Sequence, residues 1–293
     1  MTSSAATMTG LVAILLWSLL AALTVATGRV PPFQLAAMTF AIGAMIGPLM
    51  WLWRPEGWRS LRQPLAAWAL GVGGLFGYHA LYFVALRLAP PAEAGLLNYL
   101  WPLLIVLFSS LLPGERLAMH HIVGACLGLI GTVVLFTGSS SLGYQPGQLP
   151  GLLAAFIAAF VWAGYSVLSR RMASVPTDAV AGFCLATAIL SAIIHVAIEV
   201  TVWPEGLTQW LAIAALGIGP VGIAFFVWDI GMKRGDIRVL GAASYATPLL
   251  STGFLILAGF AKPSATLAVA ALLIAAGGLI AARDMLKRSQ QRS

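Results

Sequence analysis

Charged side chains are scarce in this sequence: Asp, Glu, Lys and Arg together make up 9% of its 293 residues. Soluble domains carry about 25% charged residues, so a water-soluble fold is excluded. The chain is 60% hydrophobic and has a mean hydropathy of +0.94. This composition predicts an all-α membrane protein that crosses the bilayer several times.

Cysteine is almost absent as well. Cys126 and Cys184 both fall inside apolar segments without CxxC or metal-ligand spacing, so we expect buried thiols and neither a disulfide nor a metal site. His195 and Glu199 are four residues apart, which predicts a pair on a helix surface. HExxH, serine nucleophile elbow and Walker A motifs are missing, so we expect neither an enzyme nor a cofactor.

Lysine and arginine are missing from the middle of the apolar segments, which disfavours phosphorylated substrates because their charge would need a partner there. A bilayer-spanning helix needs about 20 mostly apolar residues. By that rule the sequence predicts ten spanning helices, joined by short connections rich in Pro, Gly and charge. They cover residues 8–27, 33–53, 65–87, 91–112, 119–137, 149–170, 178–201, 209–231, 238–259 and 265–286.

The sixteen Lys and Arg residues are placed unevenly around these helices. With the N-terminus inside, only Arg29, Arg87 and Lys262 lie outside, and thirteen lie inside. Those thirteen are Arg54, Arg59, Arg62, Arg116, Arg170, Arg171, Lys233, Arg234, Arg238, Arg283, Lys287, Arg288 and Arg292. This positive-inside pattern predicts that both termini are cytoplasmic. It also explains the net charge of +7 without a nucleic-acid partner.

The stretch 71–104 returns 146 residues later as 217–250. In this alignment Gly71 matches Gly217, and Tyr99 matches Tyr245. Pro102 also matches Pro248, and Trp17 matches Trp162 at an offset of 145. We therefore expect two repeats, 1–143 and 144–293. Since each holds five helices, the second must insert upside down, which places a binding site where the halves meet.

Several motifs carry a resemblance to a known family. An LLWSLL helix is followed by PPFQLAAMTF, and GLLNYLWPLLIVLFSSLLPGERL precedes a glycine-rich fifth helix. Together with the two halves, they resemble the drug/metabolite transporter (DMT) superfamily, EamA type, over nearly the whole chain. The pair Tyr78-His79, Tyr82 and the run NYLWP at 98–102 are most similar to the YddG-type aromatic amino acid exporters. The resemblance implies a cavity lined by helices 1–4 and 6–9, with helices 5 and 10 as outer supports.

Aromatic and neutral polar residues on the third and fourth helices are the first candidates for substrate binding. Tyr78 and Tyr82 share one helix face with His79 beside them, and Asn98, Tyr99 and Trp101 lie on the next helix. Such walls suit a flat apolar ring with a polar head. An interfacial aromatic belt is the alternative for the tyrosines, and a histidine bonded to a neighbouring helix is the alternative for His79.

Further candidates come from the other helices and from the second repeat. For binding they are Trp17, Trp162, Tyr165, Ser244 and Tyr245, with ordinary helix packing as the alternative. For gating or coupling they are His79, Asp229, Pro102 and Pro248. Asp229 has Lys233 four residues on, so an i,i+4 ion pair is its alternative role. The two prolines bend their helices, either as hinges or as static bends.

Together these observations predict an inner-membrane transporter. We expect it to export neutral, apolar metabolites, above all aromatic amino acids, by alternating access around a central cavity. Another substrate of the same superfamily, such as a drug, a purine or a different amino acid, is the alternative. An intramembrane enzyme is disfavoured, because the scattered histidines do not form a nucleophile–base pair. A channel is the remaining alternative, and it would show flux without saturation. Ten helices in one chain remove the need for a second copy, so we expect a monomer.

Overall fold

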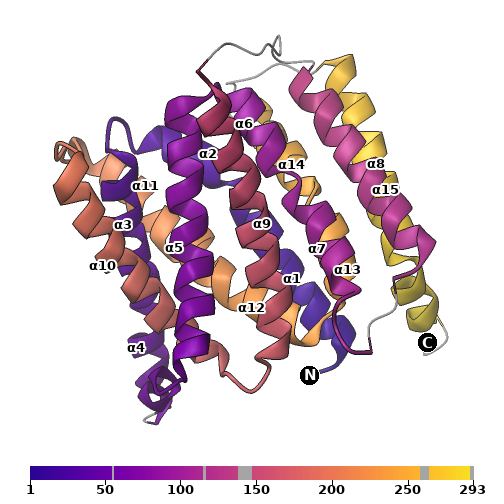
Figure 1. Cartoon of the computed structure of the whole chain (residues 1–293), viewed down its shortest axis with the longest axis horizontal. Helices are drawn as coiled ribbons and strands as arrows, with labels where there is room; N and C mark the ends of the chain where they lie inside the picture. Colours follow the sequence, from indigo (N-terminus) through magenta and orange to yellow (C-terminus); the bar gives the residue numbers. More distant parts are fainter. Residues whose placement is uncertain (55, 115–116, 138–146, 258–263, 291–293) are drawn as a thin grey trace.

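The computed structural model of the chain is helical throughout the part that it describes, which is every residue except 55, 115–116, 138–146, 258–263 and 291–293 (Figure 1). The α-helices are α1 (Ser3–Ser18), α2 (Leu20–Ala26), α3 (Pro32–Ala44), α4 (Ile46–Trp51), α5 (Leu65–Leu88), α6 (Pro91–Asn98), α7 (Trp101–Ser109), α8 (Met119–Thr137), α9 (Leu149–Arg171), α10 (Val180–Ile198), α11 (Gly206–Ile218), α12 (Ala224–Arg234), α13 (Ile237–Ala243), α14 (Ala246–Leu257) and α15 (Ala265–Gln290). Short turns of other helix types are η1 (Gly57–Leu61), η2 (Thr177–Ala179) and the π-helical η3 (Gly219–Ile223).

Eight stretches among the described residues are long and apolar enough to cross a bilayer. They are Ser3–Ala26, Pro32–Trp51, Leu65–Leu88, Met119–Thr137, Leu149–Arg171, Thr177–Ile198, Gly206–Arg234 and Ala265–Arg283. A shorter apolar helix covers Glu93–Ser109, and α13 and α14 follow α12. The chain is thus an all-α protein that crosses the membrane repeatedly. The predicted repeat boundary at 143/144 lies outside the described residues, as do Arg116, Lys262 and Arg292.

Three helical segments are interrupted just before a proline: α3/α4 before Pro48, and the two that carry the predicted prolines. α6 ends at Asn98 and α7 begins at Trp101, and likewise α13 ends at Ala243 and α14 begins at Ala246. Pro102 and Pro248 follow these breaks. A proline inside a helix has no N–H to donate, and its ring clashes with the carbonyl four residues earlier. Each of the two prolines predicted to bend its helix thus follows a short break in that helix.

The neighbouring helices α3 and α10 run antiparallel, and each end of the pair carries a charged contact. At one end, Glu199 accepts hydrogen bonds from the backbone N–H of Phe33 (3.1 and 3.2 Å) and of Gln34 (3.1 Å), in the first turn of α3. At the other end, Arg54 lies 4.0 Å from Asp178 in η2. The first N–H groups of a helix have no partner within it, so Glu199 caps α3 from a distant part of the chain.

The expected surface position of the His195–Glu199 pair is wrong. His195 Nδ1 lies 3.0 Å from Glu199 Oε2, but only 1% of the Glu199 side chain is exposed. Arg87 Nη2 also reaches Glu199, at 2.9 Å from Oε1, and His195 Nε2 lies 2.9 Å from Thr201 Oγ1. The carboxylate is buried because it holds the start of α3, and its two partners offset the cost of removing the charge from water.

The remaining long helices also pack in antiparallel pairs. α8 and α15 lie side by side at one edge of the bundle, where Gly124 meets Gly277 and Gly131 meets Ile274 (Figure 1). A Cβ at Gly124 would collide with the Gly277 carbonyl, so the close approach requires glycine. The glycines of α8 thus allow the close packing of these two helices.

Two further pairs, α1 with α12 and α5 with α9, form the middle of the bundle. Thr7 in α1 accepts a hydrogen bond of 2.8 Å from the N–H of Asp236, just after α12. The N-terminal end of α1 and the C-terminal end of α15 lie at the same end of the bundle (Figure 1). Asp236 therefore lies at the same end of the bundle as the N-terminal end of α1.

Candidate functional site

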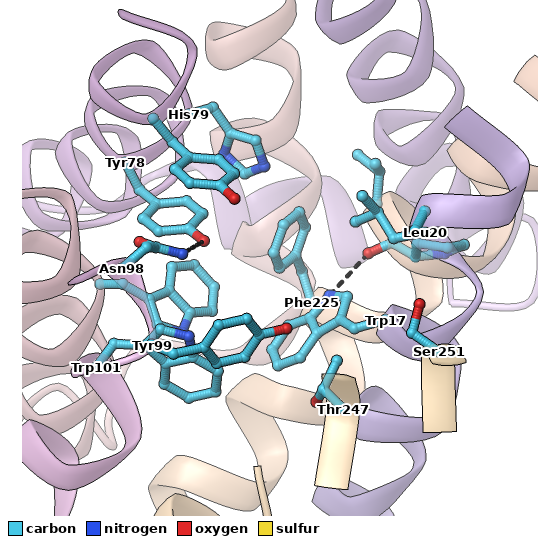
Figure 2. A pocket seen from close by; sticks show the side chains of 15 residues that line it. Trp17, Leu20, Tyr78, His79, Asn98, Tyr99, Trp101, Phe225, Thr247 and Ser251 are labelled. Atoms are coloured by element: carbon cyan, nitrogen blue, oxygen red, sulfur yellow. Dashed lines mark hydrogen bonds between the residues drawn. The ribbon is translucent and has the colours of Figure 1, made fainter. Parts of the chain in front are cut away.

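A cavity of about 230 Å³ lies among side chains of α1, α2, α5, α6, α7, α9, η3, α12 and α14 (Figure 2). It is lined by Trp17, Leu20, Ala21, Tyr78, His79, Tyr82, Asn98, Tyr99, Trp101, Trp162, Pro220, Val221, Phe225, Thr247 and Ser251. None of these residues is Asp, Glu, Lys or Arg. Pockets for drug-sized ligands measure about 300–1,000 Å³, so this cavity suits a smaller molecule without net charge.

Tyr78, Tyr82 and Asn98 form one wall of the cavity. The Asn98 Nδ2 group donates a hydrogen bond of 3.0 Å to the Tyr78 hydroxyl (Figure 2). The Tyr78 and Tyr82 rings are stacked, with centroids 6.0 Å apart and planes at 10°, as their i,i+4 spacing on α5 allows. Tyr99, at the break between α6 and α7, also lines the cavity. The structure thus brings together the polar residues predicted on the third and fourth helices.

His79 is held by one hydrogen bond and by aromatic rings from three helices. Its Nδ1 lies 2.7 Å from the carbonyl oxygen of Leu75, one turn earlier on α5. Phe40 from α3 and Phe225 from α12 present rings perpendicular to the imidazole, at 5.0 and 6.1 Å between centroids. Phe83 adds a third ring at 6.1 Å. These contacts fix the orientation of the imidazole at the cavity wall.

Four tryptophans meet at the cavity, and we call them the tryptophan cluster: Trp17, Trp101, Trp162 and Trp228. Their ring centroids lie between 5.0 and 6.4 Å apart. Trp17 Nε1 donates to the Pro220 carbonyl at 3.0 Å, and Trp228 Nε1 donates to Ser166 Oγ at 3.1 Å. The first three line the cavity, whereas Trp228 is buried behind them. Offset and edge-to-face rings of this kind make a rigid apolar surface.

Several lining residues were not predicted from the sequence: Leu20, Ala21, Pro220, Val221, Phe225, Thr247 and Ser251. Most are apolar and look like lipid-facing residues. The repeat offset of 146 could have found two of them, since Phe225 is the counterpart of His79, and Thr247 is the counterpart of Trp101. Pro220 and Val221 face the cavity from the π-helical turn η3, which changes the face that the helix presents.

Three predicted binding residues lie outside the cavity lining. Tyr165 lies one turn beyond Trp162 on α9, packed against Gly74. The Ser244 hydroxyl donates to the Leu240 carbonyl of its own helix at 2.7 Å. Tyr245 is fully buried against Gly128, and its hydroxyl accepts a hydrogen bond of 3.2 Å from the Leu103 N–H. The break before Pro248 turns these last two side chains away from the cavity and into helix contacts.

Asp229 lies on the other side of the tryptophan cluster, in a buried polar layer. Its Oδ1 pairs with Lys233 Nζ at 2.9 Å, and its Oδ2 accepts from Thr177 Oγ1 at 2.7 Å. Lys233 also donates to the Val175 carbonyl at 2.8 Å. The ion pair considered for Asp229 is therefore present, and it joins α12 to the start of α10. Pro102 and Pro248 are buried beside their helix breaks and do not line the cavity.

The polar groups of the cavity can hold a neutral ligand or a zwitterion, but they offer no unshielded charge. The two indole N–H groups of Trp101 and Trp162 and the hydroxyls of Tyr82 and Tyr99 are donors on the lining. Within the described residues, no group of three or more His, Cys, Asp or Glu side chains is placed to hold a metal ion. This arrangement is chemically suited to binding and release.

Comparison with known proteins gives consistent matches over nearly the whole chain. The sequence profile of the EamA-like transporter family matches residues 4–137 and 149–283. An aromatic amino acid exporter YddG of Ancylobacter novellus is 59% identical over 282 residues, covering 96% of this chain and 98% of that protein. The Escherichia coli aromatic amino acid exporter YddG is 27% identical over 300 residues, covering 96% of this chain and 97% of that protein. A crystal structure with 59% identity superimposes with a TM-score of 0.91, covering 96% of this chain and 98% of its own.

Proposed function

This chain belongs to the EamA-like transporter family, and on that premise we propose that it exports aromatic amino acids across the cell inner membrane. The observation that carries the proposal is the uncharged cavity of about 230 Å³ walled by aromatic rings. A family of transporters also accounts for a chain that spans the membrane many times.

The cavity matches both parts of an aromatic amino acid. The faces of Tyr78, Tyr82 and the tryptophan cluster can pack against a flat ring, because aromatic pairs favour offset and edge-to-face contacts. The neutral donors and acceptors can bind the ammonium and carboxylate groups, whose charges cancel. A substrate with net charge would leave an unpaired charge in a buried site, at a high free-energy cost.

For the topology we propose ten spanning helices in two inverted repeats, 1–143 and 144–293, with both termini in the cytoplasm. Equivalent helices of an inverted repeat run antiparallel, and α3 with α10 and α8 with α15 do so. The pairs α1 with α12 and α5 with α9 would be two copies of one contact, between the first helix of one repeat and the third of the other. The common end of α1 and α15 agrees with an even number of crossings.

For the transport cycle we propose alternating access with the cavity open to the outside in this conformation. The tryptophan cluster and the Asp229–Lys233–Thr177 layer would then close the cytoplasmic side. Opening that side requires α12 to separate from α10, which breaks these contacts. The breaks before Pro102 and Pro248 would serve as hinges, and His79 and Asp229 are the two candidates for proton coupling. A single chain contains both halves of this cavity, so we propose that the monomer transports.

A counterflow assay tests the function directly. Purified protein is reconstituted into liposomes loaded with unlabelled L-phenylalanine, and uptake of labelled L-phenylalanine is measured against empty liposomes. We expect saturable uptake that unlabelled L-tyrosine and L-tryptophan inhibit, and that Trp101→Ala reduces by at least about tenfold, in line with the loss of a stacked ring. A Cys126→Ala variant, at a half-buried position outside the cavity, serves as the control.

The same liposomes separate the alternatives. Counterflow of another amino acid, a purine or a cationic drug without any counterflow of aromatic amino acids would assign the protein a different substrate within its family. Uptake that increases linearly with concentration and never saturates would indicate a channel. Either result contradicts export of aromatic amino acids by alternating access.

A further inference from the structure

His79 is bound to its own helix in a way that fixes where its proton lies. Nδ1 lies 2.7 Å from the Leu75 carbonyl oxygen. A carbonyl oxygen has no proton to donate, so Nδ1 must carry the hydrogen of this bond. In the neutral imidazole the other nitrogen, Nε2, then has a lone pair and acts as an acceptor.

The surroundings of Nε2 leave that lone pair to the cavity. The ring contacts of His79 are with Phe40, Tyr78, Phe83 and Phe225, and the three phenylalanines carry no polar group. Within the described residues, the only hydrogen bond of the imidazole is the one from Nδ1. Since His79 lines the cavity, Nε2 is available to a donor on a bound molecule.

The neighbouring Tyr78 has the complementary property. Its hydroxyl oxygen accepts from Asn98 Nδ2 at 3.0 Å, so the hydroxyl proton is not used in that bond. The Tyr78 and His79 rings are perpendicular, with centroids 5.1 Å apart (Figure 2). One wall of the cavity therefore presents a donor and an acceptor side by side.

We propose that this pair recognises the two charged groups of an α-amino acid. His79 Nε2 accepts a hydrogen bond from the ammonium, and the Tyr78 hydroxyl, oriented by Asn98, donates to the carboxylate. Both contacts have one charged partner, which makes them stronger than bonds between neutral groups. The inference rests on the proposed function and adds what selects the substrate: the amino acid head at Tyr78 and His79, with the ring in the rest of the cavity.

The first test crosses two variants with three ligands. Tyr78→Phe removes only the hydroxyl. His79→Phe removes the acceptor, and phenylalanine is chosen because it is the residue at the matching position of the second repeat, Phe225. Dissociation constants are measured for L-phenylalanine, for 3-phenylpropionate, which lacks the ammonium, and for 2-phenylethylamine, which lacks the carboxylate. Both analogues carry a net charge and should bind more weakly than L-phenylalanine, so each variant is compared with the unmodified protein for the same ligand. The full-length protein in detergent is used, with intrinsic tryptophan fluorescence as the signal.

Each variant should weaken only the ligands that carry the group it binds. We expect His79→Phe to weaken L-phenylalanine and 2-phenylethylamine by roughly tenfold or more and to leave 3-phenylpropionate within about twofold, as for loss of one hydrogen bond to a charged group. Tyr78→Phe should weaken L-phenylalanine and 3-phenylpropionate and spare the amine. Equal losses for all three ligands, or no loss for L-phenylalanine, would overturn the proposal.

Acidification provides a second test, which needs only L-phenylalanine. Protonated Nε2 can no longer accept a hydrogen bond from an ammonium, so affinity should fall as the pH is lowered and His79 takes up a proton. The other groups that titrate on the lining are the phenols of Tyr78, Tyr82 and Tyr99, which stay protonated as the pH is lowered. Phe40 and Phe225, the neighbours from α3 and α12, do not titrate.

Two glutamine variants decide where that pH dependence originates. His79→Gln retains an acceptor that does not titrate, so binding should remain and its pH dependence should vanish. His195→Gln, outside the cavity, should retain the pH dependence. A pH dependence that persists in His79→Gln overturns the proposal. If the unmodified protein binds no aromatic amino acid at any pH, the proposed function itself fails.

Discussion

In α6/α7 the residues at the helix break, Asn98 and Tyr99, line the cavity, whereas in α13/α14 their counterparts Ser244 and Tyr245 pack away from it. Both breaks precede a proline, and the two segments match at an offset of 146 residues. The same backbone irregularity therefore serves two purposes. In the first copy it presents polar side chains to the cavity, and in the second it supports the bundle.

The break in the second copy stabilises the break in the first copy. The Tyr245 hydroxyl accepts a hydrogen bond from the Leu103 N–H, just beyond the break in the first copy. A backbone N–H without a partner is costly in the membrane interior, because no water can replace the missing bond. No hydrogen bond from Tyr99 to the second copy is seen among the described residues, so this support runs in one direction.

The largest effect should come from removing the supporting ring. Tyr245→Ala leaves a cavity against Gly128 and an unpaired Leu103 N–H, so we expect a loss of about 3 kcal/mol in stability, as for other buried aromatic truncations. The measurement is the melting temperature in detergent, with Tyr99→Ala as the matched variant of the first copy. If Tyr99→Ala lowers the melting temperature as much as Tyr245→Ala, the two tyrosines do not differ in role.

The next effect concerns the cavity side of the comparison. Asn98→Ser installs the residue of the second copy and removes the bond to Tyr78. We expect L-phenylalanine counterflow to fall by roughly tenfold, because the Tyr78 hydroxyl loses the hydrogen bond that orients it toward the substrate. The amount of folded protein, followed by size-exclusion chromatography, should change little. Unchanged counterflow in Asn98→Ser would remove Asn98 from the site.

A smaller effect isolates the hydrogen bond across the two copies. Tyr245→Phe keeps the ring against Gly128 and removes only the acceptor for the Leu103 N–H. We expect a loss of about 1–2 kcal/mol in stability, the cost of one unsatisfied buried donor. Tyr99→Phe is the control, because its hydroxyl makes no such bond within the described residues. Equal melting temperatures for Tyr245→Phe and the unmodified protein would show that the bond is unimportant.

The smallest effect is expected at Ser244. Its hydroxyl bonds to the Leu240 carbonyl, which belongs to the same helix. Replacing it with alanine loses a local bond of a kind that contributes little to helices, so Ser244→Ala should change stability by less than about 0.5 kcal/mol and leave counterflow unchanged. A large loss of transport in this variant would place Ser244 in the substrate pathway after all.

The helices and the first-copy side of the cavity could be predicted from the sequence, because they depend on local patterns. Apolar length, loop charge and the i,i+4 spacing of Tyr78 and Tyr82 suffice for that part. The direction of a side chain at a break does not follow from such patterns. Ser244 and Tyr245 were expected in the cavity by analogy with the first copy, but a break frees the helix beyond it to rotate, and tertiary contacts with α8 set the outcome.

Other parts depended on long-range contacts that have no local signature. Pro220 and Val221 reach the cavity only through the π-helical turn η3, which sequence periodicity does not reveal. Glu199 looked like a surface residue, because the segment it caps lies far away in the chain. One of the two side-chain partners of Asp229 could be predicted. The ion pair with Lys233 follows from the i,i+4 spacing, whereas the hydrogen bond from Thr177 has no signal in the sequence.

The cap on α3 has a consequence for how the protein is made. The Phe33 and Gln34 N–H groups find their acceptor in a residue synthesised 166 and 165 positions later. A ribosome therefore delivers the start of this helix to the membrane well before its partner exists. Until Glu199 is made, those donors need another acceptor, such as water, so the cap on α3 can form only after synthesis has passed well into the second half.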